Sequence, residues 1–478
     1  MTSRKRTAIT CCLLLTLFLF VACKKPMNSL AITHVTVIDV TSASPAPDQT
    51  VLVEKEKIVV IGPSQAVAIP SGAKIVDGSG KFLIPGLADM HVHLTGSGEP
   101  DGSRKFILPL LVANGITTVR DMGGYLDSLL PLRKEIEEGK RTGPRIIFAG
   151  PYLDGDPPAF QPAIVVKDRT QADDAVQKLT QRGVDFIKVQ SNLSRDAYFA
   201  VAAAAKQRNI SFVGHVPDRI TAWEAAAAGQ KSIEHLTGEL RACSINEPDL
   251  IRTQFQDSSS AAQTAWQRVL LDSYSDQKAV ELIAKFREQN TWQTPTLILL
   301  RDLAFSSGNL GLPSNPHVKY VPRKLLGIWQ QGYEQARTGV TRDQAFVRSA
   351  LLEKSFGLVE LMQKGRVKVL AGTDTAAPYI FPGFSLHEEL ALLVKAGLTP
   401  AEALQAATRN PAEFLGALDS QGAIAVGQNA DLVLLDANPL DNIYNTQQIR
   451  AVILRGRLLD RPALNLLLTD AERWAAVN

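Results

Sequence analysis

The chain has 478 residues, of which 45% are hydrophobic and 21% charged, a composition that excludes a disordered protein. Lys and Arg total 51 against 48 Asp and Glu, but Arg4, Lys5 and Arg6 lie in a leader without acids, so the remainder balances at 48 of each. This balance excludes the basic patch that nucleic acid or an anionic membrane surface would require, and we expect neither as a partner.

Residues 1–22 are predicted to be a signal peptide. The basic triplet precedes an apolar run over 11–21 that is too short to span a membrane comfortably. Phe20-Val21-Ala22-Cys23 then resembles a bacterial lipobox, in which Cys23 would be lipidated and followed by a linker over 23–29. Phe20 stands where a lipobox usually has Leu. The alternative to lipidation is therefore ordinary cleavage of the signal peptide followed by secretion. The predicted location is the bacterial cell envelope, with the lipid anchor as the sole membrane attachment.

The cysteines exclude an internal disulfide in the mature chain. Cys11 and Cys12 leave with the leader and Cys23 would carry lipid, so Cys243 remains alone. We expect it to be a buried, inert thiol.

Both ends of the mature chain have a residue pattern that is typical of β-strands. Short β-branched runs broken by Gly, Pro and Ser fill 30–82, and similar runs return within 416–464. We therefore expect one small β-sandwich domain assembled from both segments, followed by a C-terminal helix or tail over 465–478.

The middle of the chain, 83–415, alternates apolar strands with helices, the pattern of a parallel sheet buried on both faces. Eight strands predict a (β/α)8 barrel of the TIM type. Two long connections, 238–290 and 301–365, exceed what a simple barrel needs and could form helical lids over its mouth. The eight predicted strands are 82–94, 115–123, 145–150, 184–190, 211–216, 232–236, 292–299 and 367–374.

Polar residues collect where barrel active sites are built, at the carboxyl ends of these strands. His91 and His93 are two residues apart, so their side chains project to one face and could bind one metal ion together. Four of the seven histidines lie at predicted strand ends. Imidazole and carboxylate suit zinc and similar divalent ions. The candidate ligands on the later strands are Lys188, His215, His235 and Asp374.

This set resembles the amidohydrolase superfamily, in particular its binuclear members, over about residues 30 to 460. The resemblance implies that His91, His93 and Asp374 hold one divalent metal ion and that His215 and His235 hold a second. Zinc is the metal expected from these donor atoms. Lys188, carboxylated by CO2, would bridge the two. A metal-bridging hydroxide would attack, with Asp374 as the proton shuttle.

The C-terminal motifs narrow the resemblance to the prolidase-like and imidazolonepropionase-like branch. They lie within 387–410, in Gly427-Gln428-Asn429-Ala430-Asp431-Leu432 and in Asn438-Pro439-Leu440. The loop 151–158 lacks the Gly-Gly-His of many prolidase-like relatives, so dipeptidase activity does not transfer directly. Tyr152 of that loop is a candidate substrate contact. The other histidines, His34, His317 and His387, are expected to be surface or capping residues.

The predicted function is hydrolysis of an amide bond in a small molecule, an N-acyl amino acid or an Xaa-Pro-like dipeptide. One alternative is a mononuclear cyclic amide hydrolase or deaminase, which needs neither Lys188 nor a second metal. Another is a surface lipoprotein that binds a ligand through a degenerate site. A homo-oligomer is compatible with the sequence, which does not define the oligomeric state.

Cys23→Ser should release the exported protein from membranes, because the substitution removes the thiol that would carry the lipid. Fractionation of cells that express the two forms measures this. Cys243→Ser is the matched control and should leave the distribution unchanged. Equal membrane association of the Cys23→Ser form would refute lipid anchoring.

Overall fold

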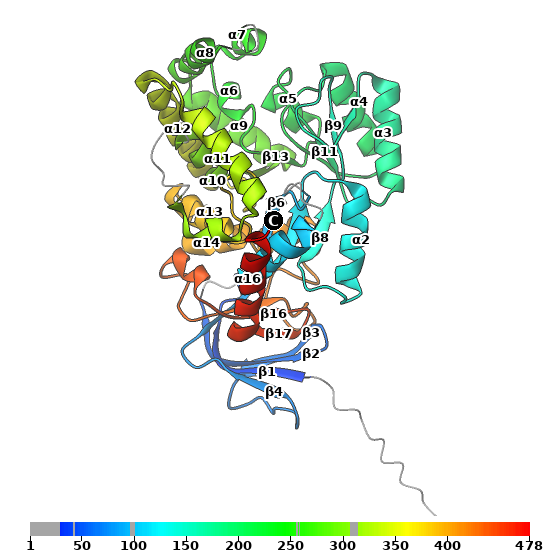
Figure 1. Cartoon of the computed structure of the whole chain (residues 1–478), viewed down its shortest axis with the longest axis vertical. Helices are drawn as coiled ribbons and strands as arrows, with labels where there is room; N and C mark the ends of the chain where they lie inside the picture. The colour runs from blue at the N-terminus through cyan, green and yellow to red at the C-terminus, as the bar shows by residue number, and fades with distance from the viewer. Residues whose placement is uncertain (1–28, 42–43, 96–100, 255–256, 258, 306–313) are drawn as a thin grey trace, which may run out of the picture.

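The computed structural model describes residues 29–41, 44–95, 101–254, 257, 259–305 and 314–478 (Figure 1). The signal peptide and Cys23 lie outside these ranges, and the location of the protein stays a prediction. Within the described residues no helix combines the length and apolar character needed to cross a membrane.

Strands from both ends of the chain form one sheet at the lower end of the molecule (Figure 1). Its path runs β17-β16-β15-β5-β1-β2-β3, with β4 also paired to β1. The ends join where β15 pairs antiparallel with β5. The strands are β1 (Ser29–Val37), β2 (Ala46–Glu54), β3 (Lys57–Pro63), β4 (Lys74–Asp77), β5 (Phe82–Pro85), β15 (Leu432–Leu435), β16 (Ile449–Leu454) and β17 (Arg457–Asp460).

This composite sheet differs from the predicted sandwich, because hydrogen bonds join all eight strands into one branched sheet. The branch lies in β1, whose residues 30–33 pair with β4 and whose residues 36–37 pair with β5. Between them His34 takes a left-handed φ of 54°, and the register with β2 shifts there. Such an irregularity bends a strand and redirects its edge, which lets β1 serve two partners on one side.

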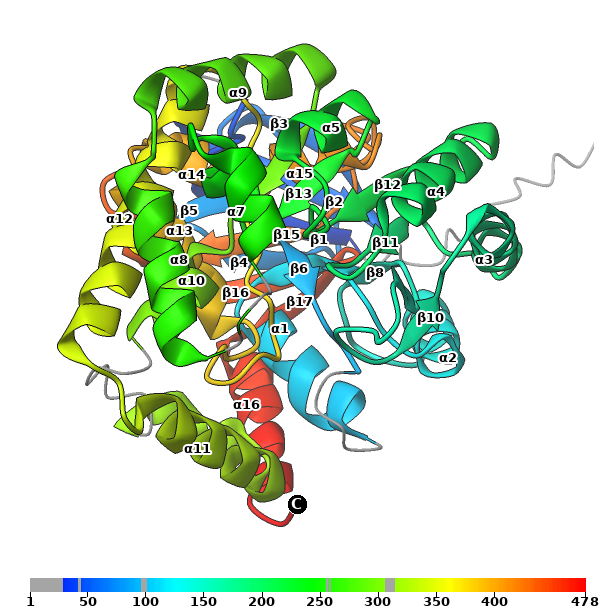
Figure 2. The same cartoon turned by 90° about the horizontal axis from the view of Figure 1, so that it is seen from above.

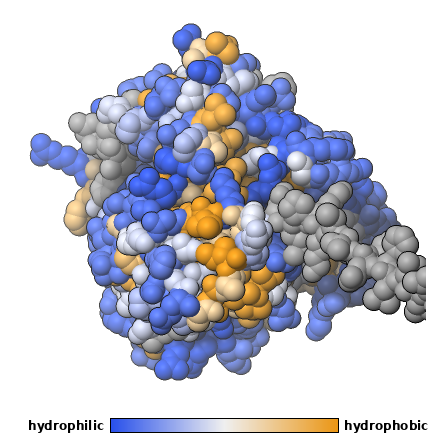
Figure 3. All heavy atoms as spheres, turned by 90° about the horizontal axis from the view of Figure 1, so that it is seen from below, coloured by the Kyte–Doolittle hydropathy of each residue, from blue (hydrophilic) through white to orange (hydrophobic). Residues whose placement is uncertain are grey.

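One hydrophobic core lies against the composite sheet and is shared by its two chain segments. Ile32, Val51 and Leu83 come from the first segment, and Leu432 and Ile453 from the second. Seen from below, the surface carries a group of apolar side chains among mostly hydrophilic ones (Figure 3).

The middle of the chain forms two parallel sheets. One has the order β6-β7-β8 and the other β10-β9-β11-β12-β13-β14. Seven of the predicted strands are present, and β9 and β10 were not predicted. The strands are β6 (Leu87–Val92), β7 (Ile116–Asp121), β8 (Arg145–Phe148), β9 (Tyr152–Asp154), β10 (Ala163–Val165), β11 (Ile187–Val189), β12 (Phe212–Gly214), β13 (Ser232–Glu234) and β14 (Trp292–Thr294).

The predicted first strand is divided at Gly86 between two sheets. β5 before it belongs to the composite sheet, and β6 after it begins the parallel strands. A Cβ at Gly86 would lie 2.2 Å from Thr117 Oγ1, so the chain passes too close to β7 for a side chain there. The predicted domain boundary after residue 82 therefore falls inside β5. At the other end, β17 ends at Asp460, inside the predicted 416–464 segment, and α16 begins at Arg461 rather than at residue 465.

The predicted eighth strand, 367–374, is not a regular strand. It forms isolated parallel bridges, Val369 with Gln293 of β14 and Thr375 with Val92 of β6. Across the other gap, Asp185 N donates to Phe148 O at 3.0 Å. Single contacts of this kind connect the two parallel sheets, and the described residues do not form a continuous parallel sheet of eight strands.

Helices follow the parallel strands and cover their outer faces. Asp168 and Ser194 cap α3 and α4 through their side chains, and Thr399 with Glu402 forms a capping box on α14. The helices outside the long connections are α1 (Leu108–Ala113), α2 (Leu126–Glu137), α3 (Arg169–Gln181), α4 (Arg195–Gln207), α5 (Ala222–Ala227), α13 (Phe384–Lys395), α14 (Pro400–Ala406), α15 (Arg409–Phe414) and α16 (Arg461–Ala475), with η1 (Ser103–Ile107) and η4 (Ile443–Gln447).

The two long connections are helical, as predicted. In the view from above, α8, α10 and α12 lie on one side of β6, with α3 and α4 on the other (Figure 2). The predicted seventh strand is too long, since β14 ends at Thr294 and α10 begins at Leu297. The helices are α6 (Glu239–Ala242), α7 (Glu247–Thr253), α8 (Ser260–Asp272), α9 (Asp276–Gln289), α10 (Leu297–Phe305), α11 (Arg323–Arg337) and α12 (Arg342–Lys364), with η3 (Pro316–Tyr320).

Gly456→Ala should destabilise the protein, because the turns of two hairpins from opposite ends of the chain touch there. Gly456 has a φ of 72°, and a Cβ would lie 1.6 Å from Lys55 O. Gly427→Ala is the matched control, since its φ of 90° is also left-handed but nothing lies within 4 Å of the added carbon.

We expect Gly427→Ala to lower the free energy of unfolding by about 1–2 kcal/mol from backbone strain, and Gly456→Ala by about 1–3 kcal/mol more from the clash. Denaturant unfolding measures both. Equal losses in the two variants would contradict the close approach of the turns.

Candidate metal centre

All six residues predicted as ligands line one cavity of about 500 Å³ at the carboxyl ends of the parallel strands. His91 lies in β6 and Lys188 in β11, while His215 and His235 come directly after β12 and β13. Asp374 belongs to the segment that bridges β14 and β6. Residues far apart in sequence meet because parallel strands end at one edge of a sheet.

Three of these residues have donor atoms that converge. One atom each of His91, His93 and Asp374 lies within 4.8 Å of the others. Asp374 Oδ1 is 3.2 Å from His91 Nε2 and 3.1 Å from His93 Nε2. Two imidazoles and one carboxylate in this arrangement suit zinc and related ions.

His215 and His235 form the neighbouring part of the site. The His235 ring lies 4.3 Å from that of His91 and 5.1 Å from that of His215, between centroids. Among the described residues, no third His, Cys, Asp or Glu completes a cluster around this pair. Lys188 is the polar side chain beside them.

Each of the four histidines forms a hydrogen bond through Nδ1, which leaves Nε2 to bind a metal ion. Neighbouring groups that hold the second nitrogen of a ligating histidine set its orientation and tautomer. His91 Nδ1 donates to Glu234 Oε2 at 3.0 Å, and His93 Nδ1 donates to Gly123 O at 3.0 Å. His215 Nδ1 is hydrogen-bonded to Ser191 Oγ at 2.9 Å and His235 Nδ1 to Thr296 Oγ1 at 2.6 Å. The donor set therefore fits divalent metal ions.

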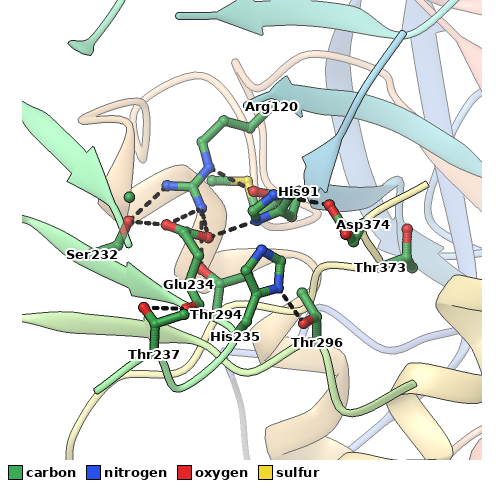
Figure 4. Close-up of polar contacts among 12 residues, drawn as sticks. His91, Arg120, Ser232, Glu234, His235, Thr237, Thr294, Thr296, Thr373 and Asp374 are labelled. Atoms are coloured by element: carbon green, nitrogen blue, oxygen red, sulfur yellow. Dashed lines mark hydrogen bonds and ion pairs between the residues drawn. The ribbon is translucent and has the colours of Figure 1, made fainter. Parts of the chain in front are cut away.

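Behind His91 lies a fully buried ion pair between Arg120 and Glu234 (Figure 4). The Arg120 guanidinium donates to both carboxylate oxygens of Glu234, at 3.0 and 2.9 Å. Burial alone would raise the pKa of Glu234, but the charge of Arg120 and the hydrogen bond from His91 outweigh it, so that pKa lies below its usual value. Glu234 thus stays ionised and can hold the Nδ1 proton of His91.

Sequence reasoning missed Arg120 and Glu234, although a signal for them existed. Both stand in short strands whose residues are all buried, where charged residues are rare unless paired. Two opposite charges in such strands indicate a partnership, but the sequence does not say which strands are neighbours in space.

The ionisation of the predicted ligands favours metal binding. Burial lowers the pKa of His235 to about 3, and burial together with the nearby Lys188 lowers the pKa of His215, so both rings are neutral near pH 7. Burial would raise the pKa of Asp374, but the facing histidines lower it overall and keep the carboxylate ionised.

Lys188 is 1% exposed and its amine is unpaired within the described residues, with no acid at ion-pair distance. Burial lowers its pKa to about 8, although Glu234 and Asp374 act in the opposite direction. A neutral amine is therefore accessible near physiological pH, which is what reaction with CO2 requires.

Three residues of the site hold left-handed backbone conformations. The φ angles are 59° at His235, 46° at Thr296 and 68° at Asp374. This conformation is uncommon outside glycine, and for a β-branched residue such as Thr296 it is strained. It turns the chain at the strand ends, where His235 and Asp374 line the cavity and Thr296 is hydrogen-bonded to His235 Nδ1.

Tyr152 borders the site as predicted, although it lies in β9 rather than a loop. Its hydroxyl is 3.3 Å from His93 Nδ1 and it lines the cavity. Burial raises the pKa of Tyr152 above its usual value, so the phenol stays protonated.

The remaining histidines lie outside this cavity. His34 is exposed and pairs with Asp48, as expected of a surface residue. His317 stacks on Phe384 at 3.8 Å between ring centroids. The prediction for His387 was wrong: it is 1% exposed, and its Nδ1 is hydrogen-bonded to Thr446, because α13 packs this face against η4.

The sequence matches the model of a family described as the amidohydrolase family over residues 82–459. The imidazolonepropionase of Vibrio cholerae is 26% identical over 426 residues, which cover 86% of this chain and 93% of the relative.

Two solved structures share the fold. One is described as AH, bottromycin amidohydrolase, with a TM-score of 0.75 and 22% identity over 94% of this chain and 90% of that one. The other is a Xaa-Pro dipeptidase with bound methionine in the active site, with a TM-score of 0.65 and 20% identity over 91% of this chain and 100% of that one.

Glu234→Gln should weaken metal binding about 10- to 100-fold, because His91 loses the carboxylate that accepts its Nδ1 proton. The change also leaves Arg120 without its counter-charge, and we expect the metal-free protein to lose about 3–5 kcal/mol of stability. Competition with a chelator measures the affinity, and thermal unfolding measures the stability.

Glu353→Gln makes the same change at an exposed position of α12 and should alter neither quantity. Retention of full metal affinity by the Glu234→Gln protein would show that the ion pair does not support the site.

Proposed function

Because this chain belongs to the amidohydrolase family, we propose that it cleaves an open-chain amide bond in an N-acyl amino acid or a dipeptide. That the chain is a hydrolase of carbon–nitrogen bonds follows from the family itself. The proposal concerns the substrate, the metal ions and the roles of individual residues.

The observation that carries the proposal is the meeting of six donor side chains around one cavity. We assign His91, His93 and Asp374 to one metal ion and His215 with His235 to a second, with zinc favoured by the donor atoms. Lys188, as its CO2-derived carbamate, would connect the two. When bound, such ions would polarise the amide carbonyl and lower the pKa of a water from 15.7 to about 7.

Lys188 has the surroundings that carbamate formation requires. Its neutral amine attacks CO2, a nitrogen–carbon bond forms, and one proton leaves, so a neutral group becomes a carbamate anion. The product would supply oxygen ligands beside His215 and His235, where the described residues offer no further carboxylate. The absence of an acid partner argues against a structural ion pair as the role of this buried lysine.

Asp374 is placed to move the protons of the reaction. Its carboxylate is ionised and borders the cavity, so it can accept a proton from the attacking water. It then returns this proton to the leaving nitrogen, which departs as an amine. Tyr152, which stays protonated, can donate a hydrogen bond to a substrate oxygen from the adjacent wall.

We also infer that the two parallel sheets are parts of one distorted (β/α)8 barrel. Residues 367–375 contact both β14 and β6, and Phe148 O accepts from Asp185 N on the opposite side. The strands follow one another in chain order, apart from the added β9 and β10. The cell-envelope location and lipidation of Cys23 remain proposals that rest on the leader.

A mononuclear cyclic amide hydrolase is the second candidate. It is supported by the similarity to an imidazolonepropionase and by the His91, His93 and Asp374 set, which is complete without Lys188. A deaminase would use the same three ligands. The alternative of a ligand-binding lipoprotein without activity is set aside, since the chain belongs to a family of hydrolases.

The zinc-loaded protein should release free amine from members of a panel of N-acyl amino acids and dipeptides, and hold about two metal ions per chain. Amine release and elemental analysis measure these two quantities. Hydrolysis confined to cyclic amides or lactones, with one metal ion per chain, would favour the second candidate instead.

Lys188→Ala should lower kcat/KM at least about 100-fold and reduce the metal content by one ion, because the connecting carboxylate is lost. Acetate or propionate should restore part of the activity by supplying a carboxylate. Lys206→Ala, an exposed position on α4, is the control. Full activity of the Lys188→Ala protein would refute the role of Lys188 as the residue that connects the two metal ions.

A further inference from the structure

A second compartment of about 480 Å³ adjoins the metal cavity. Three residues line both spaces: His235 of the site, and Leu300 and Leu303 of α10. The second compartment continues between α10 and α12, and its wall is mainly aliphatic, with Leu240, Leu351 and Leu352 among its residues. Each space alone has the volume of an ordinary small-molecule pocket, so together they exceed what a dipeptide needs.

Arg348 of α12 stands in the wall of this second compartment. In the part of the chain that the structure describes, its guanidinium forms no ion pair or hydrogen bond, and no acid lines the compartment. Nearby arginines behave differently: Arg301 pairs with Asp302 and Glu388, and Arg268 pairs with Asp343.

An unpaired, half-buried guanidinium in an apolar wall is suited to an anion. Arginine presents a planar set of donors that matches a carboxylate, and such a pair is stronger where water is partly excluded. The α-carboxylate of an N-acyl amino acid is one carbon from the scissile nitrogen. It therefore cannot extend past Leu300 and Leu303 into the second compartment while the amide lies at the metal site.

We infer that the preferred substrate carries a second carboxylate, separated from the scissile amide by an extended apolar segment, and that Arg348 binds it. The apolar segment would lie along Leu300 and Leu303, and the terminal carboxylate would meet the guanidinium. This inference rests on the proposed amide hydrolysis and adds the shape and charge of the substrate. It makes Arg348 a specificity residue, remote from the reacting atoms.

Binding of simple acids tests the inference without catalysis. Calorimetry compares nonanedioate with nonanoate, which differ by the second carboxylate, on the zinc-loaded full chain. We expect nonanedioate to bind at least about 10-fold more tightly, an advantage that Arg348→Gln removes and Arg348→Lys retains in part. Arg342→Gln, an exposed arginine at the start of the same helix, should keep the full advantage.

Equal affinities of the two acids for the unaltered protein, or an advantage that survives in Arg348→Gln, would overturn the inference. Either result can be obtained even if no amide substrate is found. The binding measurement therefore tests the role of Arg348 separately from the proposed amide hydrolysis.

Kinetics give a second measurement on N-acyl phenylalanines whose nine-carbon acyl chain ends in carboxylate or methyl. Arg348→Gln should raise KM about 10-fold for the carboxylate-ended substrate, leave its kcat unchanged, and change neither constant more than about 3-fold for the methyl-ended one. If both substrates are hydrolysed and the variant affects them equally, the proposed function stands and the role of Arg348 is refuted.

Discussion

The buried ion pair between Arg120 and Glu234 is the interaction on which the rest of the site depends. Arg120 of β7 donates to Met90 O of β6, and also to Ser232 and Glu234 of β13 and Thr294 of β14. Its partners thus belong to both parallel sheets, whose backbones are joined only by single contacts among the described residues. A buried charge without its counter-charge costs several kcal/mol, so the two sheets are held in the arrangement that keeps this pair together. His91 receives its orientation from the same carboxylate.

The positions of the candidate ligands could be predicted from the sequence, whereas the residues that hold these side chains in place could not. The carboxyl ends of parallel strands meet in space, so the positions of His91, Lys188 and Asp374 in the sequence are enough to indicate that their side chains lie close together. The partner of Arg120 lies 114 residues away, and no local pattern pairs them. The same holds for Arg348, whose importance depends on which wall α12 forms. Local rules place residues on an element, but packing between distant elements decides what they face.

The elements that were wrongly predicted are those where tertiary contacts override local preference. Residues 367–374 have the apolar run of a strand, yet the left-handed turn at Asp374 and the close passage of Gly372, whose Cβ would lie 2.9 Å from that of His91, prevent a regular ladder. The segment 292–299 was predicted as one strand, but its second half begins α10, where Glu389 accepts the first two N–H groups of the helix. In both places the irregular backbone lies against the cavity.

The composite sheet gives the molecule an order of assembly. During synthesis β1 to β5 emerge first, but the outer edge of β5 has no partner until β15 has been made, some 350 residues later. An unpaired edge is open to wrong partners, and it is closed here by a strand that follows the whole catalytic region. The sheet therefore closes only on a chain that already contains all six candidate ligands of the metal centre.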